Sequence, residues 1–240
     1  MALAHTVGEA NGLAVQRDLR QPTLRPAAMT DAPVAAELIY QPMGRMADYL
    51  FGGDDRDCAL EVFAKLFAQS QNRFSHQFSD MLELGREVAG MLLSYPAGIL
   101  GGLSAPMAKQ LREIIGWGAM ARLVHRSAPL MMLKEYEPDE FYIFTVSVHP
   151  KFQHRGFGKQ LLKHAEDKAK AAGLRKCSLG VTVDNVGAIR LYERFNYRIV
   201  ETVRVPHLES VIQYPGYHRM VKTLPPDPSR GGLAEAAEAD

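Results

Sequence analysis

The chain has 240 residues, which suits one large domain or one domain with appendages. Hydrophobic residues make up 47% of it, so a full core can form, and the net charge of +1 argues against general electrostatic binding of nucleic acid. The two cysteines, Cys58 and Cys177, lie far apart, and no Cys-x-x-Cys or histidine-rich spacing suggests a metal site, so no metal is expected. The chain does not open with a basic-then-apolar signal peptide, which favours a cytoplasmic protein.

Both ends of the chain have the composition of tails. Residues 1–21 lack a sustained hydrophobic period, and residues 225–240 begin with a proline-rich run and end with a glycine pair and an Ala/Glu run. We therefore expect flexible tails at 1–21 and 225–240, and one domain over residues 22–224.

The first half of this domain is predicted to form a strand, two helices and a β-hairpin. A strand is expected at Thr23–Arg25, a helix from Asp31, and a second helix from Asp54 or Asp55 through Leu66. Two runs rich in strand-forming residues, 78–84 and 88–95, flank a Gly-Arg turn and predict a β-hairpin.

The uncharged stretch 89–107 has the length of a membrane span but is interrupted by glycine and proline. We interpret it as a buried strand to Tyr95 followed by a flexible loop, and expect no membrane segment. Further along, Met107–Arg122 can form a helix, although Gly116 and Gly118 weaken it. This helical insert (about 96–140) is either an extra core-packing helix, a homodimer contact, or a lid over an acceptor pocket.

The second half alternates strands with helices. We expect strands over 141–148, 179–183, 197–205 and 217–223, with helices over 159–172 and 186–194. This mixture predicts an α/β fold with helices on both faces of a sheet.

A glycine-containing turn at 153–158 separates the strand that ends at Val148 from the helix that follows. Gly156 and Gly158 allow a sharp turn and a close approach by a ligand, and the helix start offers unpaired N–H groups to an anion. The turn is not a P-loop, because no Gly-Lys-Ser/Thr follows, and it lacks the Gly-x-Gly-x-x-Gly dinucleotide fingerprint.

The Gln-x-x-Gly-x-Gly spacing of this turn resembles the acetyl-coenzyme A loop of the GNAT N-acetyltransferase superfamily. Residues 185–197 are similar to the superfamily's Asn-x-x-Ala-x-x-Leu-Tyr-Glu-x-x-Gly-Phe segment, with Asn196 where Gly is common. Residues 146–150 resemble the end of its fourth strand, and residues 23–31 more weakly resemble its first strand and helix start. The 142–197 block looks most like the ribosomal-protein N-acetyltransferases.

The resemblance implies a GNAT-like fold: a mixed, mostly antiparallel sheet, splayed between strands 4 and 5. Here it would carry the helical insert between strands 3 and 4. It also implies acetyl-CoA as co-substrate, held by main-chain groups of the fourth strand and by the turn. The cofactor-binding candidates are Val146, Val148, Gln153, His154, Arg155, Gly156, Phe157, Gly158, Lys159, Asn185 and Tyr192.

Two residues are candidates for catalysis. By the family pattern Tyr192 is the general acid that protonates the thiolate leaving group; its alternative is a core aromatic on a short helix. Asn185 would bind the cofactor or a water near it, or simply cap that helix. Glu140 is the first candidate for the general base, although a surface position is the favoured interpretation of each candidate and the base can also act through water. The other candidates are Glu137 and Asp139 before the central strand, and Glu209, Tyr214 and His218 in or beside the last hairpin.

The implied reaction is direct attack of a primary amine on acetyl-CoA in a ternary complex. A small-molecule amine is the favoured acceptor, because the insert departs from the compact protein-modifying members. A protein N-terminal or lysine acetyltransferase is the alternative, and a non-catalytic acyl-CoA-binding sensor is the alternative from another class.

Overall fold

The computed structural model describes residues 21–130 and 133–225, so nearly all of both predicted tails lies outside the described residues. Seven strands form one sheet in the order β1-β2-β3-β4-β5-β7-β6. Only β4 and β5 pair in parallel; the other neighbours are antiparallel, which confirms the predicted sheet. The strands are β1 (Pro22–Pro26), β2 (Ser79–Leu84), β3 (Glu87–Pro96), β4 (Phe141–Val148), β5 (Lys176–Thr182), β6 (Arg198–Val203) and β7 (Tyr217–Thr223).

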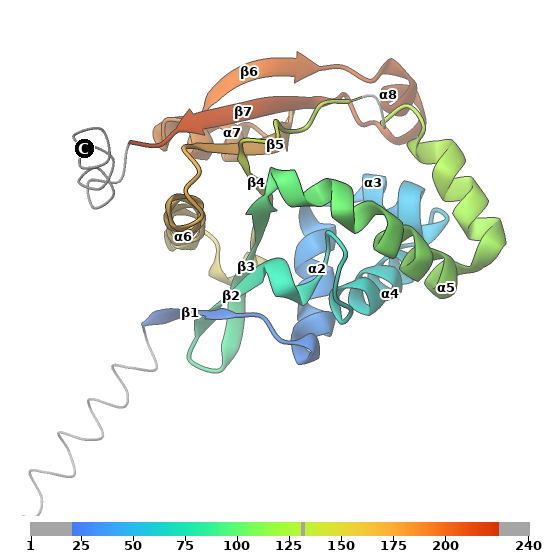
Figure 1. Ribbon diagram of the computed structural model, residues 1–240, viewed down its shortest axis with the longest axis horizontal. Coiled ribbons are helices and arrows are strands. Elements are labelled where there is room, and N and C mark those ends of the chain that lie inside the picture. The colour runs from blue at the N-terminus through green and yellow to red at the C-terminus, as the bar shows by residue number, and fades with distance from the viewer. Residues whose placement is uncertain (1–20, 131–132, 226–240) are drawn as a thin grey trace, which may run out of the picture.

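Helices lie on both faces of the sheet (Figure 1). The helices from the first half of the chain pack together, whereas α6 and α7 pack into a separate apolar cluster. The helices are α2 (Ala32–Met43), α3 (Arg45–Ala47), α4 (Arg56–Phe67), α5 (Leu100–Ser127), α6 (Phe157–Ala171), α7 (Val186–Arg194) and α8 (Pro206–Ile212). Short helical turns are η1 (Met29–Asp31), η2 (Asp48–Gly52), η3 (His76–Phe78), η4 (Ala97–Ile99) and η5 (Pro150–Phe152), of which η2 is a π-turn.

Two apolar clusters fill the space on either side of the sheet. One joins α2, α4 and α5 to the sheet, with Phe63, Phe67 and Met91 fully buried. The other joins α6 and α7 to the sheet around Leu161, Leu162 and the thiol-bearing Cys177. Among the described residues, no helix combines the length and apolarity that a membrane crossing requires.

The insert between β3 and β4 is helical, as predicted, but its helix starts earlier than expected. The flexible loop predicted after Tyr95 is wrong, because η4 leads directly into α5 at Leu100 rather than at Met107. Burial of Leu100, Leu111 and Leu123 against the α2–α4 cluster outweighs the poor helix propensity of the glycines and Pro106. Gly116 does interrupt the helix: its φ of 75° kinks α5.

The tight turn after α7 follows the sequence interpretation. Asn196 takes a φ of 64°, in the left-handed region that asparagine tolerates better than most residues. The chain can therefore leave α7 and enter β6 without the glycine that is common at this position.

Candidate active site

Strands β4 and β5 separate part of the way along the sheet. They pair only where Phe141–Ile143 faces Cys177–Leu179, and β4 then continues for five residues to Val148 without β5 beside it. A β-bulge on β4 marks the change, since Leu93 and Ser94 of β3 face Thr145 and Ile143 and leave Phe144 as the extra residue. The sheet is therefore splayed between its fourth and fifth strands, as the fold prediction stated.

The hydrogen-bond pattern decides which main-chain groups of β4 face this opening. The amide of His149 donates to the carbonyl of Ala89 on the β3 side at 2.9 Å. Because hydrogen-bonded positions alternate along an antiparallel pair, Ser147 also bonds β3, whereas Val146 and Val148 turn their N–H and C=O groups towards the opening. The Val148 carbonyl accepts the side-chain amides of Gln153 at 3.1 Å and Gln41 at 3.2 Å.

The turn that follows β4 exposes the start of α6. His154 and Gly156 adopt φ values of 62° and 82°, so the chain reverses sharply before α6 begins at Phe157. Gly156 is the N-cap and supplies no capping side chain, and the first intrahelical bond is made by the amide of Gln160. The amides at the start of α6 thus lack a capping partner, which is the arrangement that binds a phosphate.

The second glycine of the turn permits a close approach between two helices. A Cβ placed on Gly158 would lie 3.3 Å from Cδ2 of Leu191 on α7, tighter than ordinary van der Waals contact. Gly158 thus brings α7, which carries Tyr192, close to the start of α6.

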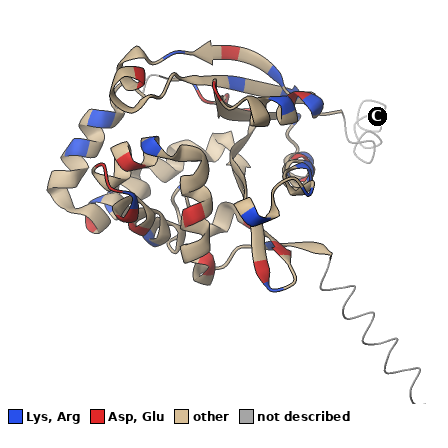
Figure 2. Cartoon of the chain, turned by 180° about the vertical axis from the view of Figure 1, so that it is seen from behind, with Lys and Arg blue, Asp and Glu red and all other residues tan. Residues whose placement is uncertain are grey.

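Two cationic side chains, Arg155 and Lys159, lie at the turn and at the start of α6. His154, Arg155 and Lys159 are exposed there, and the Arg155 guanidinium lies 5.5 Å from the centre of the Phe152 ring. Further along α6, Lys163 pairs with Asp167 and Lys168 with Asp80, and Figure 2 shows basic and acidic residues together on this helix. The charge on the later part of α6 is thus partly neutralised, while Arg155 and Lys159 keep their charge at the turn.

Tyr192 lies on α7, in the same apolar cluster that Val146 and Val148 border. Its ring centre is 6.2 Å from that of Tyr197, and burial raises the pKa of its phenol to about 12. Tyr192 therefore stays protonated at neutral pH, as a proton donor must. Asn185 serves as the N-cap of α7, with its side chain accepting the amide of Ala188 at 3.1 Å.

Glu140, the candidate base, is 2% exposed and has a partner for each carboxylate oxygen. Arg219 of β7 donates to Oε1, and the amide of Glu137 donates to Oε2 at 2.9 Å. A carboxylate in this position is already committed to two donors, so its contacts favour a structural role over proton abstraction.

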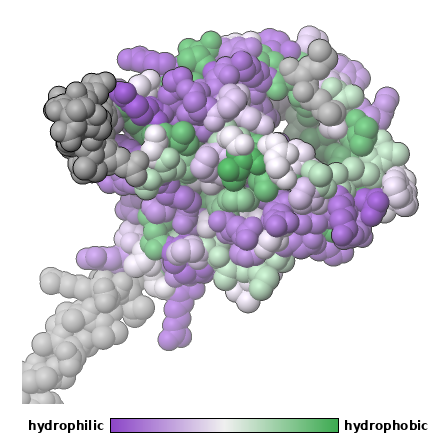
Figure 3. Space-filling model, viewed as in Figure 1, coloured by the Kyte–Doolittle hydropathy of each residue, from purple (hydrophilic) through white to green (hydrophobic). Residues whose placement is uncertain are grey.

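A cavity of about 180 Å³ lies beyond the C-terminal end of β5. Its lining comes from three separate segments, around α3, after β5 and before β7, and Arg45 donates to Gln213 across it. Figure 3 shows the surface hollowed between the α8 layer and the helices α3 and α5. The lining residues are Met43, Arg45, Met46, Thr182, Asp184, Ile212, Gln213, Tyr214 and Pro215.

Only some of the residues that line this cavity could be predicted from the sequence. Tyr214 lies beside the last hairpin, where the sequence places candidates for the base. No local pattern marks Arg45, because α3 has three residues and no periodicity, and none marks Asp184, which follows β5. Their proximity depends on contacts between segments more than 130 residues apart, such as Arg45 with Gln213.

Comparison with known proteins agrees with this geometry. The sequence model of the acetyltransferase (GNAT) family matches residues 64–197, more than half of the chain. A ribosomal-protein alanine N-acetyltransferase of Salmonella typhimurium is 39% identical over 59 residues, which are 25% of this chain and 40% of that protein. The chain thus matches well under half the length of this curated relative.

Solved structures match over a larger share of the chain. An acetyltransferase crystal structure is 25% identical with a TM-score of 0.63 and covers 85% of this chain and 100% of its own. An N-acetyltransferase of Staphylococcus aureus Mu50 has the same TM-score at 21% identity, over 83% of this chain and 100% of its own, and so shows the fold. With the splayed sheet, the glycine turn and these matches together, the chain belongs to the acetyltransferase (GNAT) family.

Proposed function

We propose that the protein transfers an acetyl group from acetyl-CoA to a primary amine by direct attack in a ternary complex. The observation that carries the proposal is the continuity of two binding elements. The open edge of β4, with the main-chain groups of Val146 and Val148, leads within nine residues to the uncapped start of α6 at Phe157. An extended pantetheine arm with a pyrophosphate at one end needs such an edge and such an anion site in that order.

The turn supplies the remaining cofactor contacts in this proposal. The amides near the start of α6 bind the pyrophosphate, Gln153 fixes the turn against Val148, and exposed Arg155 and Lys159 attract phosphate oxygens. The described residues contain no cluster of metal-ligating side chains, and the proposed reaction requires none.

The transfer step uses one main-chain donor and one phenol. The amine nitrogen attacks the thioester carbonyl carbon, and the Val148 N–H stabilises the oxyanion. This attack forms the C–N bond, and the nitrogen of the tetrahedral intermediate then gives one proton to a base or to water. When the intermediate collapses, the C–S bond breaks, Tyr192 gives its proton to the leaving thiolate, and solvent returns a proton to the phenolate. The ammonium proton of the acceptor is lost to a base or to water before attack.

The cavity beyond β5 is the proposed acceptor site, and its size supports a small-molecule amine. Its volume of about 180 Å³ suits a small molecule, and the Arg45–Gln213 hydrogen bond lies across it. Asp184 lines it and can attract an ammonium group. The likeness to a ribosomal-protein alanine N-acetyltransferase supports the alternative acceptor, a protein α-amine.

One experiment distinguishes a small-molecule acceptor, a protein acceptor and a non-catalytic sensor. Purified protein is mixed with acetyl-CoA and, separately, with pooled small amines and with peptides bearing a free N-terminus, and thiol release is followed with a chromogenic disulfide. Release with small amines supports the proposal, and release with peptides alone supports the alternative acceptor. Binding of acetyl-CoA without release from any pool would replace the enzyme with a non-catalytic sensor.

A further inference from the structure

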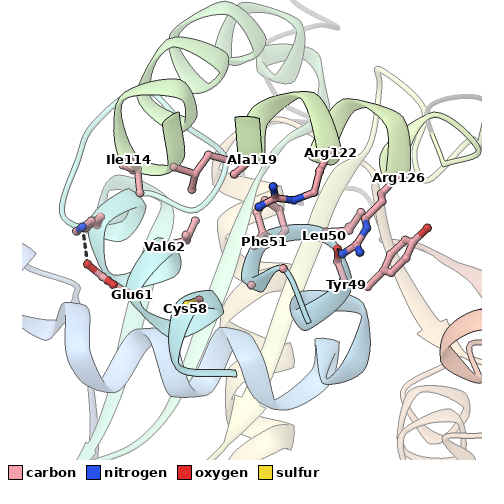
Figure 4. A pocket seen from close by; sticks show the side chains of 14 residues that line it. Tyr49, Leu50, Phe51, Cys58, Glu61, Val62, Ile114, Ala119, Arg122 and Arg126 are labelled. Carbon is pink, nitrogen blue, oxygen red and sulfur yellow. Dashed lines mark hydrogen bonds and ion pairs between the residues drawn. The ribbon is translucent and has the colours of Figure 1, made fainter. Parts of the chain in front are cut away.

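A second cavity, of about 220 Å³, lies among α4, α5 and the π-turn η2, and it shares no lining residue with the cavity beyond β5. None of the predicted cofactor or catalytic residues lines it. Figure 4 shows α5 crossing above it, with the π-turn and α4 below. Its lining residues are Tyr49, Leu50, Phe51, Gly52, Gly53, Cys58, Glu61, Val62, Lys65, Ile114, Ile115, Ala119, Arg122 and Arg126.

The lining of this cavity combines an apolar part with four charged side chains, Glu61, Lys65, Arg122 and Arg126. Phe51 is half-buried and packs on Phe63 and Phe74 at ring-centre distances of 5.2 and 5.7 Å, so its ring extends a larger aromatic cluster to the cavity wall. Val62 of α4 and Ile114 of α5 add aliphatic surface from opposite sides. An apolar body that displaces water from such walls gains free energy on binding.

One charge at the cavity is unpaired. Arg122 extends from α5 towards Phe51 (Figure 4), and it forms no hydrogen bond or ion pair with any residue in the described part of the chain. The other charged groups are matched: Lys65 pairs with Glu61, and Arg126 pairs with Asp54 and donates to the Tyr49 carbonyl. The guanidinium of Arg122 is therefore the group that remains for an anionic ligand.

The rim is held in an uncommon backbone conformation. Gly53 and Asp54 have φ values of 62° and 76°, and the Asp54 carboxylate is fixed by Arg126 at 2.8 Å. The kink at Gly116 lets Ile114, before it, and Ala119, after it, both reach the cavity. A non-glycine residue such as Asp54 in the left-handed region is uncommon, and such residues cluster at functional sites, as single-turn π-helices do.

From these observations we propose that the cavity binds a small carboxylate with an apolar body, its carboxylate on Arg122 and its body against Phe51, Val62 and Ile114. A planar guanidinium matches a carboxylate through two parallel hydrogen bonds. The ligand class follows from the exposed, unpaired guanidinium of Arg122 beside the apolar part of the lining, and this site is separate from the proposed transfer site.

The test uses benzoate as the probe and benzamide, of the same shape but neutral, as its control. Isothermal titration of the full chain should show benzoate binding and no benzamide binding. Arg122→Gln should weaken benzoate binding about tenfold or more, because a charge-assisted bidentate contact is lost, while Arg122→Lys should retain part of it. Lys109→Gln removes the same charge from an exposed position of α5 outside the cavity and should leave benzoate binding unchanged.

A second variant keeps the test decisive if charge effects are small. Ala119→Leu adds bulk inside the cavity and should abolish benzoate binding while circular dichroism shows the fold retained. Equal affinity for benzoate and benzamide, equal weakening by Arg122→Gln and Lys109→Gln, or full binding by folded Ala119→Leu would each overturn the proposal. Loss of benzoate binding on saturation with coenzyme A would also overturn it, because the probe would then occupy the other site.

Discussion

Glu140 and Arg219 form an ion pair across the centre of the sheet, from the residue before β4 to β7, with side chains that are 2% and 9% exposed. The two residues lie 79 positions apart in the sequence. Glu137 binds the second carboxylate oxygen through its amide, so the pair also fixes the connector that leads from the insert into β4. This connector precedes the strand whose free edge defines the candidate site.

The first prediction concerns this pair. Glu140→Gln leaves the Arg219 guanidinium buried without its countercharge, and we expect the free energy of unfolding to fall by about 3 kcal/mol in urea denaturation. Asp139→Asn is the matched control, because the neighbouring Asp139–Lys176 pair is exposed and should contribute little.

The same variant tests the predicted base role of Glu140. If the ion pair is structural, the pH–rate profile per folded molecule keeps its wild-type shape in Glu140→Gln. Loss of the acidic limb of that profile, with stability unchanged, would instead identify Glu140 as the base.

This pair illustrates what the sequence could and could not predict. The strand, turn and helix over 141–171 are local, since β-branched runs, two glycines and a helical period lie within some thirty residues. The pairing of Glu140 with Arg219 depends on strand order, which no local pattern encodes. For the same reason, no local pattern predicts the cavity that Arg45, Asp184 and Gln213 line.

For α5, by contrast, the local sequence signal itself gave a wrong prediction. Gly101, Gly102 and Pro106 argued for a loop, yet all three lie inside α5. Pro106 is the seventh residue of α5, beyond the first turn where proline is tolerated, and burial of Leu100 and Leu111 offsets its cost. Gly116, by contrast, broke the helix as its propensity indicated, because Trp117 beside it is exposed and little tertiary packing opposes the kink.

The second prediction tests the general acid. Tyr192→Phe removes the phenolic proton and keeps the buried ring, so turnover should fall about a hundredfold or more while the KM for acetyl-CoA changes little. Tyr197→Phe, the same change in the neighbouring buried ring, should leave turnover near wild type. Steady-state kinetics of both variants decide the point, and equal turnover in Tyr192→Phe and wild type would remove Tyr192 from the mechanism.

The third prediction concerns the raised pKa of the buried Tyr95 phenol. Burial raises the pKa of Tyr95 from 10.0 to about 12. Above pH 10 the unfolded chain releases this proton while the folded chain keeps it, so stability is retained below pH 10 and lost between pH 10 and 12. Urea denaturation across this range should show Tyr95→Phe with a slope shallower by about 1.4 kcal/mol per pH unit. Parallel slopes for the two proteins would show that Tyr95 does not keep its proton in the folded state.

The fourth prediction contrasts two glycines in open space. At Gly156 an added Cβ meets nothing within 4 Å, but the φ of 82° disfavours any side chain, so Gly156→Ala should cost about 1 kcal/mol of stability or rearrange the turn. Either outcome displaces the amides at the start of α6, and the Kd for coenzyme A should rise about tenfold. Gly101→Ala, in a helical position of α5 with equal space around it, should raise stability by up to about 1 kcal/mol and leave that Kd unchanged. Calorimetric titration with coenzyme A compares the two variants directly. A Kd that is the same in both would mean that the conformation of the 153–158 turn does not determine cofactor binding.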